Sequence, residues 1–250
     1  MKTRYFIEIS FKGTNYVGWQ AQKNGISIQT TLDEALSKIL QDTVTSLGAG
    51  RTDSGVHAES FMAHFDTHSD IDQNTVFKLN CFLPPNIAVK NIFTTKEKQN
   101  ARFDCISRSY RYIISSQKSP FLENEAWVTF RKFDIDKMNK AANILLTTKD
   151  FQAFSRVQTN VKHFRCDVQH AEWKKKGNTT VFNIKANRFL RGMVRAIVGT
   201  TLKVGLGAIS LKEFKDVIRS KDRTKAGAAA NPYGLYFMKA EYPFKLTPVK

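Results

Sequence analysis

The sequence predicts an α+β fold built from two halves. The first observation is that apolar and polar residues alternate in several short runs, a pattern typical of half-buried strands. The second is that residues 31–40 and 189–204 repeat apolar residues at the spacing of an amphipathic helix. The third is the order of these elements, in which neighbouring strands and helices mix without a regular strand–helix alternation. That order favours α+β over a parallel α/β array.

The N-terminal half, residues 1–105, is expected to open with a strand. Tyr5, Ile7, Ile9 and Phe11 alternate with residues of the other face, and a turn follows at Lys12-Gly13-Thr14-Asn15. The further elements expected here are a helix at 31–40, a strand at 61–66, a break at Pro84-Pro85-Asn86 and a strand at 87–93. Thr31 and Glu34 have the spacing of a capping box, so this helix is predicted to begin there.

The C-terminal half, residues 106–250, follows a boundary near Asp104–Ser107. The strands expected in it are 108–114, 168–173, 180–186 and 235–242, and the helices are 134–146, 189–204 and 211–220. Tyr110 and Tyr112 fall on one face of the first of these strands. Ser210 and Glu213 have the spacing of a capping box for the last helix.

The charge of the chain points to a polyanionic partner. Its 39 Lys and Arg residues outnumber 22 Asp and Glu, which gives a net charge of +17. Nucleic acid is the favoured partner, because each neutralised phosphate releases counterions. An anionic membrane surface is the main competitor, and simple solubility is the bland explanation. No apolar run is long enough to span a bilayer and no signal sequence opens the chain, so a membrane location is not expected.

The cysteines and histidines favour neither a disulfide framework nor a metal site. Cys81, Cys105 and Cys166 are few, odd in number and widely spaced, which fits a reducing cytoplasm. His64 and His68 lie on an expected strand without a glutamate in a metalloprotease pattern. No metal is therefore expected.

Asp53 is the most informative candidate for chemistry. It lies in the polar segment 48–58, where Gly50 and Gly55 permit unusual turns. Arg51 can hold the carboxylate in its ionised form, as nucleophilic attack requires. A turn residue, a nucleophile and a general acid or base all remain open, as does an Arg51–Asp53 pair that only pins the loop. Asp53-Ser54-Gly55 also matches the short signature of aspartic proteases, but these enzymes need a second such aspartate, which a homodimer would have to supply.

A group of arginines supplies a candidate site for phosphate. If the helix 189–204 begins at Phe189, then Arg188, Arg191 and Arg195 share a face at its N-terminal end. Helix N-terminal amides and bidentate guanidinium groups both attract phosphate. The alternative is a solvated basic face, as many helices have.

Tyr110 is an aromatic candidate for the site. It lies on the strand 108–114 in a basic stretch, where a tyrosine that faces a cleft can stack on a base. The alternative is an ordinary packed strand aromatic. Trp19 and Phe103 are interpreted as core residues.

Several motifs together resemble the tRNA pseudouridine synthase A family, and the resemblance spans the chain. The matching segments are Phe11–Gln20, Gly48–Ala58, Ala101–Phe103, Tyr110–Tyr112, Asn187–Arg195 and Gly234–Pro243. The segment around Asp53 is the longest and most specific of them. Ser54 stands where alanine is usual in that family, and Arg188 and Arg191 fall at its variable positions.

The resemblance implies that the protein isomerises uridine to pseudouridine at positions 38, 39 and 40 in the anticodon stem-loop of tRNA. It implies the pseudouridine synthase fold, with two α+β halves that each have a mixed or antiparallel sheet, and an active-site cleft between them. It also implies a homodimer without cofactor or metal. Asp53 would be the nucleophile and Tyr110 would contact the target base, while Arg51 and Arg195 match site arginines. Arg188 and Arg191 lie outside the matched positions and remain candidates for contacts to the RNA backbone.

Two questions stay open at this point. Asp53 can attack C6 of the uracil ring or act at C1′ of the ribose, and both roles need an ionised, positioned carboxylate. An RNA-binding protein without chemistry would leave Asp53 dispensable. An aspartic protease would be indifferent to RNA.

Overall fold

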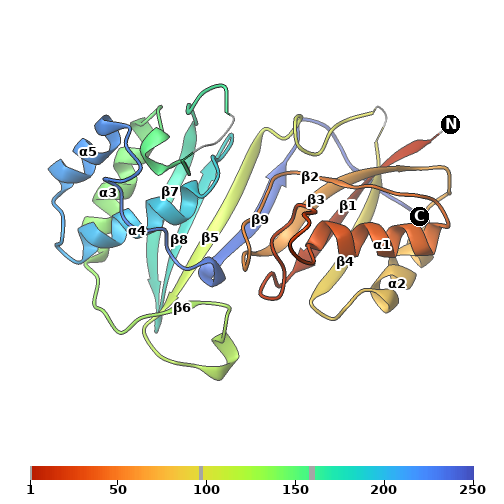
Figure 1. The fold of residues 1–250 in the computed structure, drawn as a ribbon, viewed down its shortest axis with the longest axis horizontal. Helices are drawn as coiled ribbons and strands as arrows, with labels where there is room; N and C mark the ends of the chain where they lie inside the picture. Colours follow the sequence, from red (N-terminus) through yellow and green to blue (C-terminus); the bar gives the residue numbers. More distant parts are fainter. Residues whose placement is uncertain (1, 96–97, 158–160) are drawn as a thin grey trace. The chain divides into compact units, whose positions relative to one another are not determined.

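The computed structural model describes residues 2–95, 98–157 and 161–250 of the chain. They form two compact units, which Figure 1 shows in colours that follow the sequence. The first unit comprises Met1–Ile106 and Phe237–Lys250, and the second comprises Ser107–Tyr236. Each unit contains both strands and helices, which confirms the α+β class.

The strands of the first unit surround β1 (Thr3–Phe11). β1 pairs antiparallel with β3 on one side and with β4 on the other. The remaining short strands extend this arrangement, β2 beside β3 and β10 beside β4, and β9 lies beside β3. The bounds of these strands are β2 Leu47–Gly48, β3 His57–Thr67, β4 Ile87–Thr94, β9 Leu235–Glu241 and β10 Thr247–Pro248.

The alternation predicted for the first strand is confirmed, and it builds the core of this unit. Ile7 is fully buried, and it faces Ala63 on β3 and Ile92 on β4. Full burial of such a side chain stabilises the fold by about 1.5–3 kcal/mol. The ring of Phe6, on the opposite face of the strand, packs edge-on against Tyr242 with 5.5 Å between ring centres. β1 is therefore covered on both faces at Phe6 and Ile7, while Glu8 and Ser10 keep the alternation in its second half.

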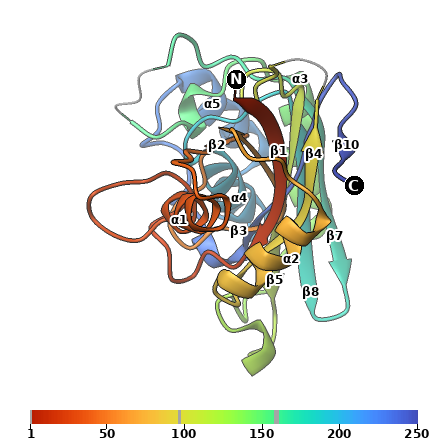
Figure 2. The ribbon, with the colours of Figure 1, turned by 90° about the vertical axis from the view of Figure 1, so that its right-hand side faces the viewer.

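Helix α1 (Ile28–Leu40) begins three residues before the predicted start. Ser27 is its N-cap, because the Ser27 side chain accepts a hydrogen bond from the Thr30 N–H at 3.0 Å. The Thr31 hydroxyl instead donates to the Ser27 carbonyl at 3.0 Å, so the predicted Thr31–Glu34 capping box is wrong. A serine N-cap is worth about 1 kcal/mol, and Ser27 is fully buried where the helix meets the core. Figures 1 and 2 show α1 along one side of the strands of this unit.

Helix α2 (Gln73–Phe82) lies in a stretch for which no helix was expected. Its capping box is present, since the Asp72 carboxylate accepts from the Thr75 N–H at 2.8 Å. Its apolar residues do not form a stripe, because Leu79 is buried while Phe77 is 66% exposed. Only the cap and the tertiary setting therefore mark this helix.

The second unit is built on an antiparallel group of three strands. β5 (Ser107–Ser115) pairs with β8 (Thr179–Ala186), and β8 pairs with β7 (Val168–Lys176) on its other side. The short β6 (Trp127–Val128) runs parallel to β5. The alternation predicted for β5 is confirmed, because Tyr110, Tyr112 and Ile114 are all buried.

Three α-helices complete the second unit. Their bounds are α3 Ile135–Thr147, α4 Met193–Gly205 and α5 Leu211–Ser220. The capping box of Ser210 and Glu213 on α5 is confirmed. Asn139 ties α3 to β7, because its amide donates to the Trp173 carbonyl at 2.9 Å and its side-chain oxygen accepts from the Trp173 N–H at 2.8 Å. Short 3-10 turns lie at Pro120–Leu122, Gln152–Phe154 and Pro232–Gly234.

The start predicted for α4 is wrong. Residues 187–192 are not helical, and the helix begins at Met193 after Gly192, whose φ is +72°. That left-handed conformation turns the chain into the helix and is open to glycine at little cost. Arg188 and Arg191 therefore precede the helix, and only Arg195 lies on it.

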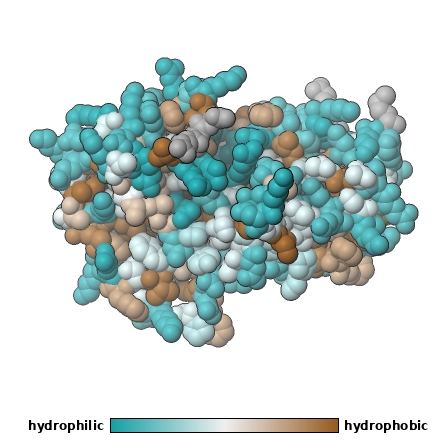
Figure 3. Space-filling view, in the orientation of Figure 1, coloured by the Kyte–Doolittle hydropathy of each residue, from teal (hydrophilic) through white to brown (hydrophobic). Residues whose placement is uncertain are grey.

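The surface agrees with the composition. The face drawn in Figure 3 is mainly hydrophilic, with apolar residues scattered between the polar ones. Within the described part of the chain, no helix has the length and apolar character needed to cross a membrane.

Candidate active site

Asp53 lies on the loop that joins β2 to β3 in the first unit. Its side chain is half-buried, and its carbonyl accepts a hydrogen bond from the Val56 N–H at 3.2 Å. This bond closes a four-residue turn with Gly55 at the third position, where φ is +79°. A positive φ at this place is characteristic of type II turns and suits glycine. The turn therefore presents Asp53 and Ser54 at its start.

A second loop, residues 12–19, holds this turn in place. The Gly13 N–H donates to Nδ1 of His57 at 3.1 Å, and the Ser54 hydroxyl donates to the Tyr16 carbonyl at 3.0 Å. The Trp19 N–H donates to the carbonyl of Thr52 at 3.3 Å. These bonds reach the residues before, beside and beyond Asp53, so the aspartate is fixed from several directions.

Close backbone contact between the two loops requires glycine at two positions. A Cβ on Gly18 would collide with the Thr52 carbonyl oxygen, and the φ of Gly18 is +105°. A Cβ on Gly13 would collide with the carbonyl of Val56. The two loops therefore meet backbone to backbone, which explains the two glycines of the segment 11–20 in physical terms.

Gln29 on α1 links the end of the second loop, at Gln20 and Ala21, to Ser46 just before β2. Its Nε2 donates to the Ser46 carbonyl at 2.7 Å, and its Oε1 accepts from Gln20 Nε2 at 2.8 Å and from the Ala21 N–H at 3.0 Å. The side chain is 6% exposed, so these bonds are shielded from water. A buried amide with its polar atoms bonded fixes the loops that it joins.

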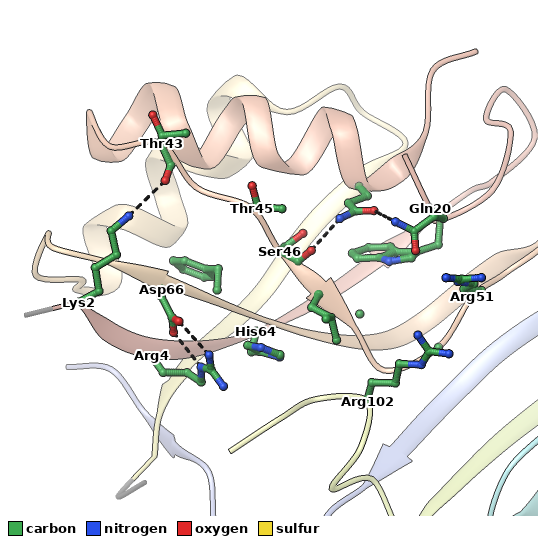
Figure 4. A pocket seen from close by; sticks show the side chains of 16 residues that line it. Lys2, Arg4, Gln20, Thr43, Thr45, Ser46, Arg51, His64, Asp66 and Arg102 are labelled. Carbon is green, nitrogen blue, oxygen red and sulfur yellow. Dashed lines mark hydrogen bonds and ion pairs between the residues drawn. The ribbon is translucent and has the colours of Figure 1, made fainter. Parts of the chain in front are cut away.

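A cavity of about 550 Å³ opens beside this frame and is lined by basic side chains. Its cationic residues are Lys2, Arg4, Arg51 and Arg102. Its one carboxylate, Asp66, accepts two bonds of 2.8 Å from the Arg4 guanidinium. Figure 4 draws this pair at one end of the cavity and Arg51 and Arg102 at the other, next to Gln20. The end with Arg51, two residues before Asp53 in the sequence, therefore has two arginines and no carboxylate.

His64 on β3 positions the segment that carries Arg102. Its Nδ1 accepts from the Ala101 N–H at 3.0 Å, while the Tyr242 hydroxyl donates to the carbonyl of Ala101 at 2.7 Å. Burial lowers the pKa of His64 to about 4, and the charge of Arg4 acts in the same direction. His64 is consequently neutral at physiological pH and serves as an acceptor at Nδ1.

Arg102 and Phe103 follow this anchored residue. The Asn100 side chain accepts the N–H groups of Arg102 at 2.9 Å and Phe103 at 3.1 Å. The Arg102 guanidinium lies over the Phe103 ring, 5.4 Å from its centre, and Phe103 is 74% exposed. The interpretation of Phe103 as a core residue is wrong, because the Asn100 turn directs it to the surface. Trp19, by contrast, is buried against Phe61 as expected.

Tyr110 lies on β5 in the second unit. It is 9% exposed, and its ring meets Phe189 edge-on with 5.0 Å between ring centres. This edge-to-face arrangement holds the ring in one orientation.

Arg195 lies in the first turns of α4, also in the second unit. Its Nε donates to the Ala230 carbonyl at 2.7 Å, and the Ala230 N–H donates to the carbonyl of Arg195 at 3.0 Å. The side chain is half-buried. This bond fixes the Nε edge of the guanidinium against the backbone at Ala230.

Arg188 and Arg191 do not share a helix face with Arg195. Both lie in the irregular segment between β8 and α4. Arg188 Nη1 approaches Nε2 of His163 at 3.4 Å, and the Arg191 carbonyl accepts from the Arg156 N–H at 2.9 Å. The predicted shared face is wrong, because it requires helical geometry from Phe189, four residues before the helix begins at Met193.

The structure thus divides the expected site residues between the units. Asp53 and Arg51 belong to the first unit, while Tyr110, Arg188, Arg191 and Arg195 belong to the second. Sequence reasoning missed Gln29, His57 and His64 as residues that position the site. A polar residue next to the apolar stripe of a helix was the signal for Gln29, but only tertiary contacts show the roles of the histidines. Among the described residues, no three His, Cys, Asp or Glu side chains form a group suited to a metal.

The chain is similar to known proteins over nearly its whole length. A family described as tRNA pseudouridine synthase matches residues 141–243. The tRNA pseudouridine synthase A of Parabacteroides distasonis is 43% identical over 99% of both chains. That of Bacteroides thetaiotaomicron is 46% identical over 96% of this chain and 91% of its own. The protein of the same name from Francisella tularensis is 42% identical over 96% of this chain and 94% of its own.

Proposed function

Since this chain belongs to the tRNA pseudouridine synthase A family, we propose that it isomerises uridine to pseudouridine at positions 38, 39 and 40 of tRNA. The enzyme is an isomerase that acts on tRNA. The main support for the proposal is the position of Asp53. This residue lies on a turn that is held by hydrogen bonds to Gly13, Tyr16 and Trp19. A carboxylate held in this way is suited to act on one atom of a bound nucleotide.

The reaction exchanges one bond between base and sugar for another. The N1–C1′ bond of uridine breaks, the uracil turns over, and a C5–C1′ bond forms. The proton on C5 is lost and N1 gains one, so the product is an isomer of the substrate. These atoms are inaccessible in a stacked stem, and the nucleotide must leave the stack at a cost of a few kcal/mol.

Asp53 is the nucleophile of the proposed reaction. It attacks either C6 of the ring or C1′ of the sugar, and both routes require the ionised carboxylate. Because the loop contacts fix the backbone on either side of Asp53, little reorganisation is needed when the nucleotide arrives.

Residues of the second unit are proposed to bind the extruded nucleotide and the RNA chain. Tyr110, whose ring is held by Phe189, contacts the target base. Arg195 stabilises negative charge on the departing uracil. Arg188 and Arg191 contact the RNA backbone. In this proposal the half comprising residues 1–105 supplies the aspartate and Arg51, and residues 106–250 supply the tyrosine and the remaining arginines.

The basic cavity supports the choice of a polyanion as substrate. Arg51 and Arg102 line it within the first unit, and the chain carries a net charge of +17. Binding of tRNA should weaken steeply as salt increases, because counterions released from the phosphates drive association.

The protein is proposed to act in the cytoplasm, where its three cysteines stay free and its substrate is found. A homodimer is also proposed, and sedimentation of the pure protein tests it.

The test is pseudouridine mapping on tRNA treated with the wild-type protein and with Asp53→Asn. The variant is expected to form no pseudouridine while it still binds tRNA, since Asn retains the shape of the side chain and loses the nucleophile. Turnover of Asp53→Asn close to wild type would contradict the assignment. Wild-type protein that binds tRNA without forming pseudouridine would favour an RNA-binding role without chemistry.

A further inference from the structure

His163 and Arg188 in the second unit face each other through nitrogen atoms, and the tautomer of the histidine decides what this contact means. Nδ1 of His163 accepts a hydrogen bond from the Arg165 N–H at 3.2 Å, so Nδ1 carries no proton. A neutral imidazole then has its proton on Nε2. Nε2 of His163 lies 3.4 Å from Nη1 of Arg188, which can only donate. Two donors therefore point to the same small space.

The two donors, Nε2 of His163 and Nη1 of Arg188, have no carboxylate acceptor between them in the described part of the chain. Within residues 2–95, 98–157 and 161–250, no carboxylate bonds to His163 or to Arg188. The nearby acids have other partners, since Asp150 pairs with Lys221 at 3.1 Å and Asp167 with Lys149 at 2.6 Å. An anion oxygen that lies to one side of the pair, at hydrogen-bond distance from both Nε2 and Nη1, would accept from both, and one of these bonds is charge-assisted.

The backbone on both sides of this pair is held in place. The Phe164 carbonyl accepts from the Phe151 N–H at 3.0 Å, and the Cys166 N–H donates to the Lys149 carbonyl at 3.1 Å. On the other side, the Asn187 side chain accepts from the Asp167 N–H at 2.8 Å. The first two bonds tie residues 164–166 to residues 149–151, and the third ties Asp167 to the segment that contains Arg188. The backbone that carries the two side chains is therefore fixed on both sides of the pair.

The surroundings favour an oxyanion with a negative charge. Lys162 and Arg165 flank His163 and are exposed. The Cys166 thiol beneath them is inert, because burial raises its pKa to about 11, although the Arg188 charge acts in the opposite direction. With the charge of Arg188 at the pair, two further cations next to His163 in the sequence and no bonded acid among the described residues, the pair suits a phosphate group better than a neutral acceptor.

We propose that His163 and Arg188 form a two-donor notch that binds one phosphate of the tRNA backbone. The inference rests on the proposed function, because it takes tRNA as the source of the phosphate. It gives Arg188 a defined partner and contact, where the sequence had indicated only a candidate for contact with phosphate or the RNA backbone. It also adds His163, for which the sequence indicated no role. A phosphate contact positions the RNA and carries no sequence information, so the notch should act alike on different tRNAs.

The first test reads the tautomer directly. Long-range nitrogen–proton NMR of His163 in the full protein should show the proton on Nε2. Inorganic phosphate, and then an anticodon stem-loop RNA, should shift the Nε2 signal and the Arg188 side-chain signals together. A proton found on Nδ1 would overturn the proposal, because Nε2 would then accept from Arg188 and the pair would be closed.

The second test measures affinity for the stem-loop RNA as a function of salt. Arg188→Gln and His163→Ala should each weaken binding about three- to tenfold, and Arg188→Gln should lower the salt slope by about one phosphate contact. His163→Gln should recover much of the loss, because its amide places a donor near the position of Nε2. Arg219→Gln removes one exposed positive charge of the same unit and should leave affinity within about twofold.

The double variant shows whether the two residues share one phosphate. The fold-loss of RNA affinity in the double variant should be smaller than the product of the two single fold-losses. This is expected when both side chains bind the same phosphate. Unchanged affinity in both single variants, with pseudouridine still formed by the wild type, would overturn the notch and leave the proposed function intact. Wild-type protein that binds the stem-loop but makes no pseudouridine would overturn the proposed function and leave the notch standing.

Discussion

The Gly13 N–H donates to Nδ1 of His57 at 3.1 Å and so joins the two loops that hold Asp53. His57 is 1% exposed, which places this bond in the core of the first unit. A buried backbone N–H that loses its acceptor costs about 1–3 kcal/mol. The geometry around Asp53 therefore depends on an imidazole four residues away.

His57 is predicted to position the aspartate loop through its Nδ1 acceptor. His57→Leu should lower the free energy of unfolding by about 1–3 kcal/mol and reduce kcat, because the Gly13 N–H is left without its partner. His57→Asn should lose less, since the amide oxygen lies near the position of Nδ1. Denaturant unfolding and pseudouridine turnover measure both effects. His68→Leu, an exposed histidine of the same unit, is the control, and an equal loss there would contradict the prediction.

Gly18 is predicted to be essential because of close contact as well as its backbone angle. Gly18→Ala should reduce turnover strongly, since a Cβ there collides with the Thr52 carbonyl oxygen beside Asp53. Gly177→Ala is the matched control. Gly177 also has a positive φ, +57°, but its Cβ would meet nothing within 4 Å.

A non-glycine residue in the left-handed region costs of the order of 1–2 kcal/mol, and Gly177→Ala carries this cost alone. Gly18→Ala carries a larger backbone strain, because +105° lies outside that region, and the collision with Thr52 as well. Gly18→Ala should therefore exceed Gly177→Ala in both lost stability and lost turnover. Equal effects on stability, with turnover retained in Gly18→Ala, would show that the loop contact is dispensable.

Tyr110 is predicted to have separable roles for its ring and its hydroxyl. Tyr110→Phe should keep the melting temperature, because the edge-to-face contact with Phe189 is retained. Tyr110→Leu should lower the stability by about 1–3 kcal/mol through lost ring packing and should also lose turnover. A fall of kcat in Tyr110→Phe without a change in melting temperature would assign proton transfer to the hydroxyl. A stable and active Tyr110→Leu would contradict a role for the ring.

Asp33 on α1 predicts how stability depends on pH. Its carboxylate accepts from the Ser46 N–H at 2.9 Å, and burial raises its pKa from 3.8 to about 6. Between about pH 4 and pH 6 the folded state then binds more protons at Asp33 than the unfolded state does. The contribution of Asp33 to stability therefore decreases as the pH rises through this window.

Asp33→Asn should remove this titration while its side-chain oxygen still accepts from Ser46. The free energy of unfolding of the variant, relative to wild type, should increase from about pH 4 to pH 6. His64 has a pKa lowered to about 4 and contributes the opposite slope, but it does so in both proteins and cancels in the difference. Urea unfolding at several pH values measures the effect. A difference that does not change with pH would contradict it.

Local pattern predicted much of the fold and the chemical group at the site. The alternation of Tyr5–Phe11 and of residues 108–114 became β1 and β5, because a strand with one buried face must alternate. The Ser210–Glu213 capping box marked the start of α5, because both partners lie within one turn. The sequence did not predict helix α2, because its apolar residues do not form one stripe and Phe77 remains exposed.

The limits of local reasoning appear where an element begins. The start of α1 was placed at Thr31 because a capping box was available there, whereas Ser27 is preferred since it is buried against the core. The start of α4 was placed at Phe189, whereas Gly192 takes a left-handed turn and the helix follows it. In both places several residues have a suitable local sequence, and tertiary packing selects one of them.

The sequence by itself determined the family, the basic charge and the α+β class and indicated Asp53 as the candidate nucleophile, because these depend on residue type and on spacing within a few positions. The tertiary structure alone decided which atoms meet. It brought His57 into contact with Gly13, His64 with Ala101, Gln29 with Ser46 and His163 with Arg188. A hydrogen bond acts over about 3 Å, whereas these partners lie 17 to 44 residues apart in the chain. Only the folded backbone brings such partners together, and it also makes Nδ1 the accepting nitrogen of His57 and His64.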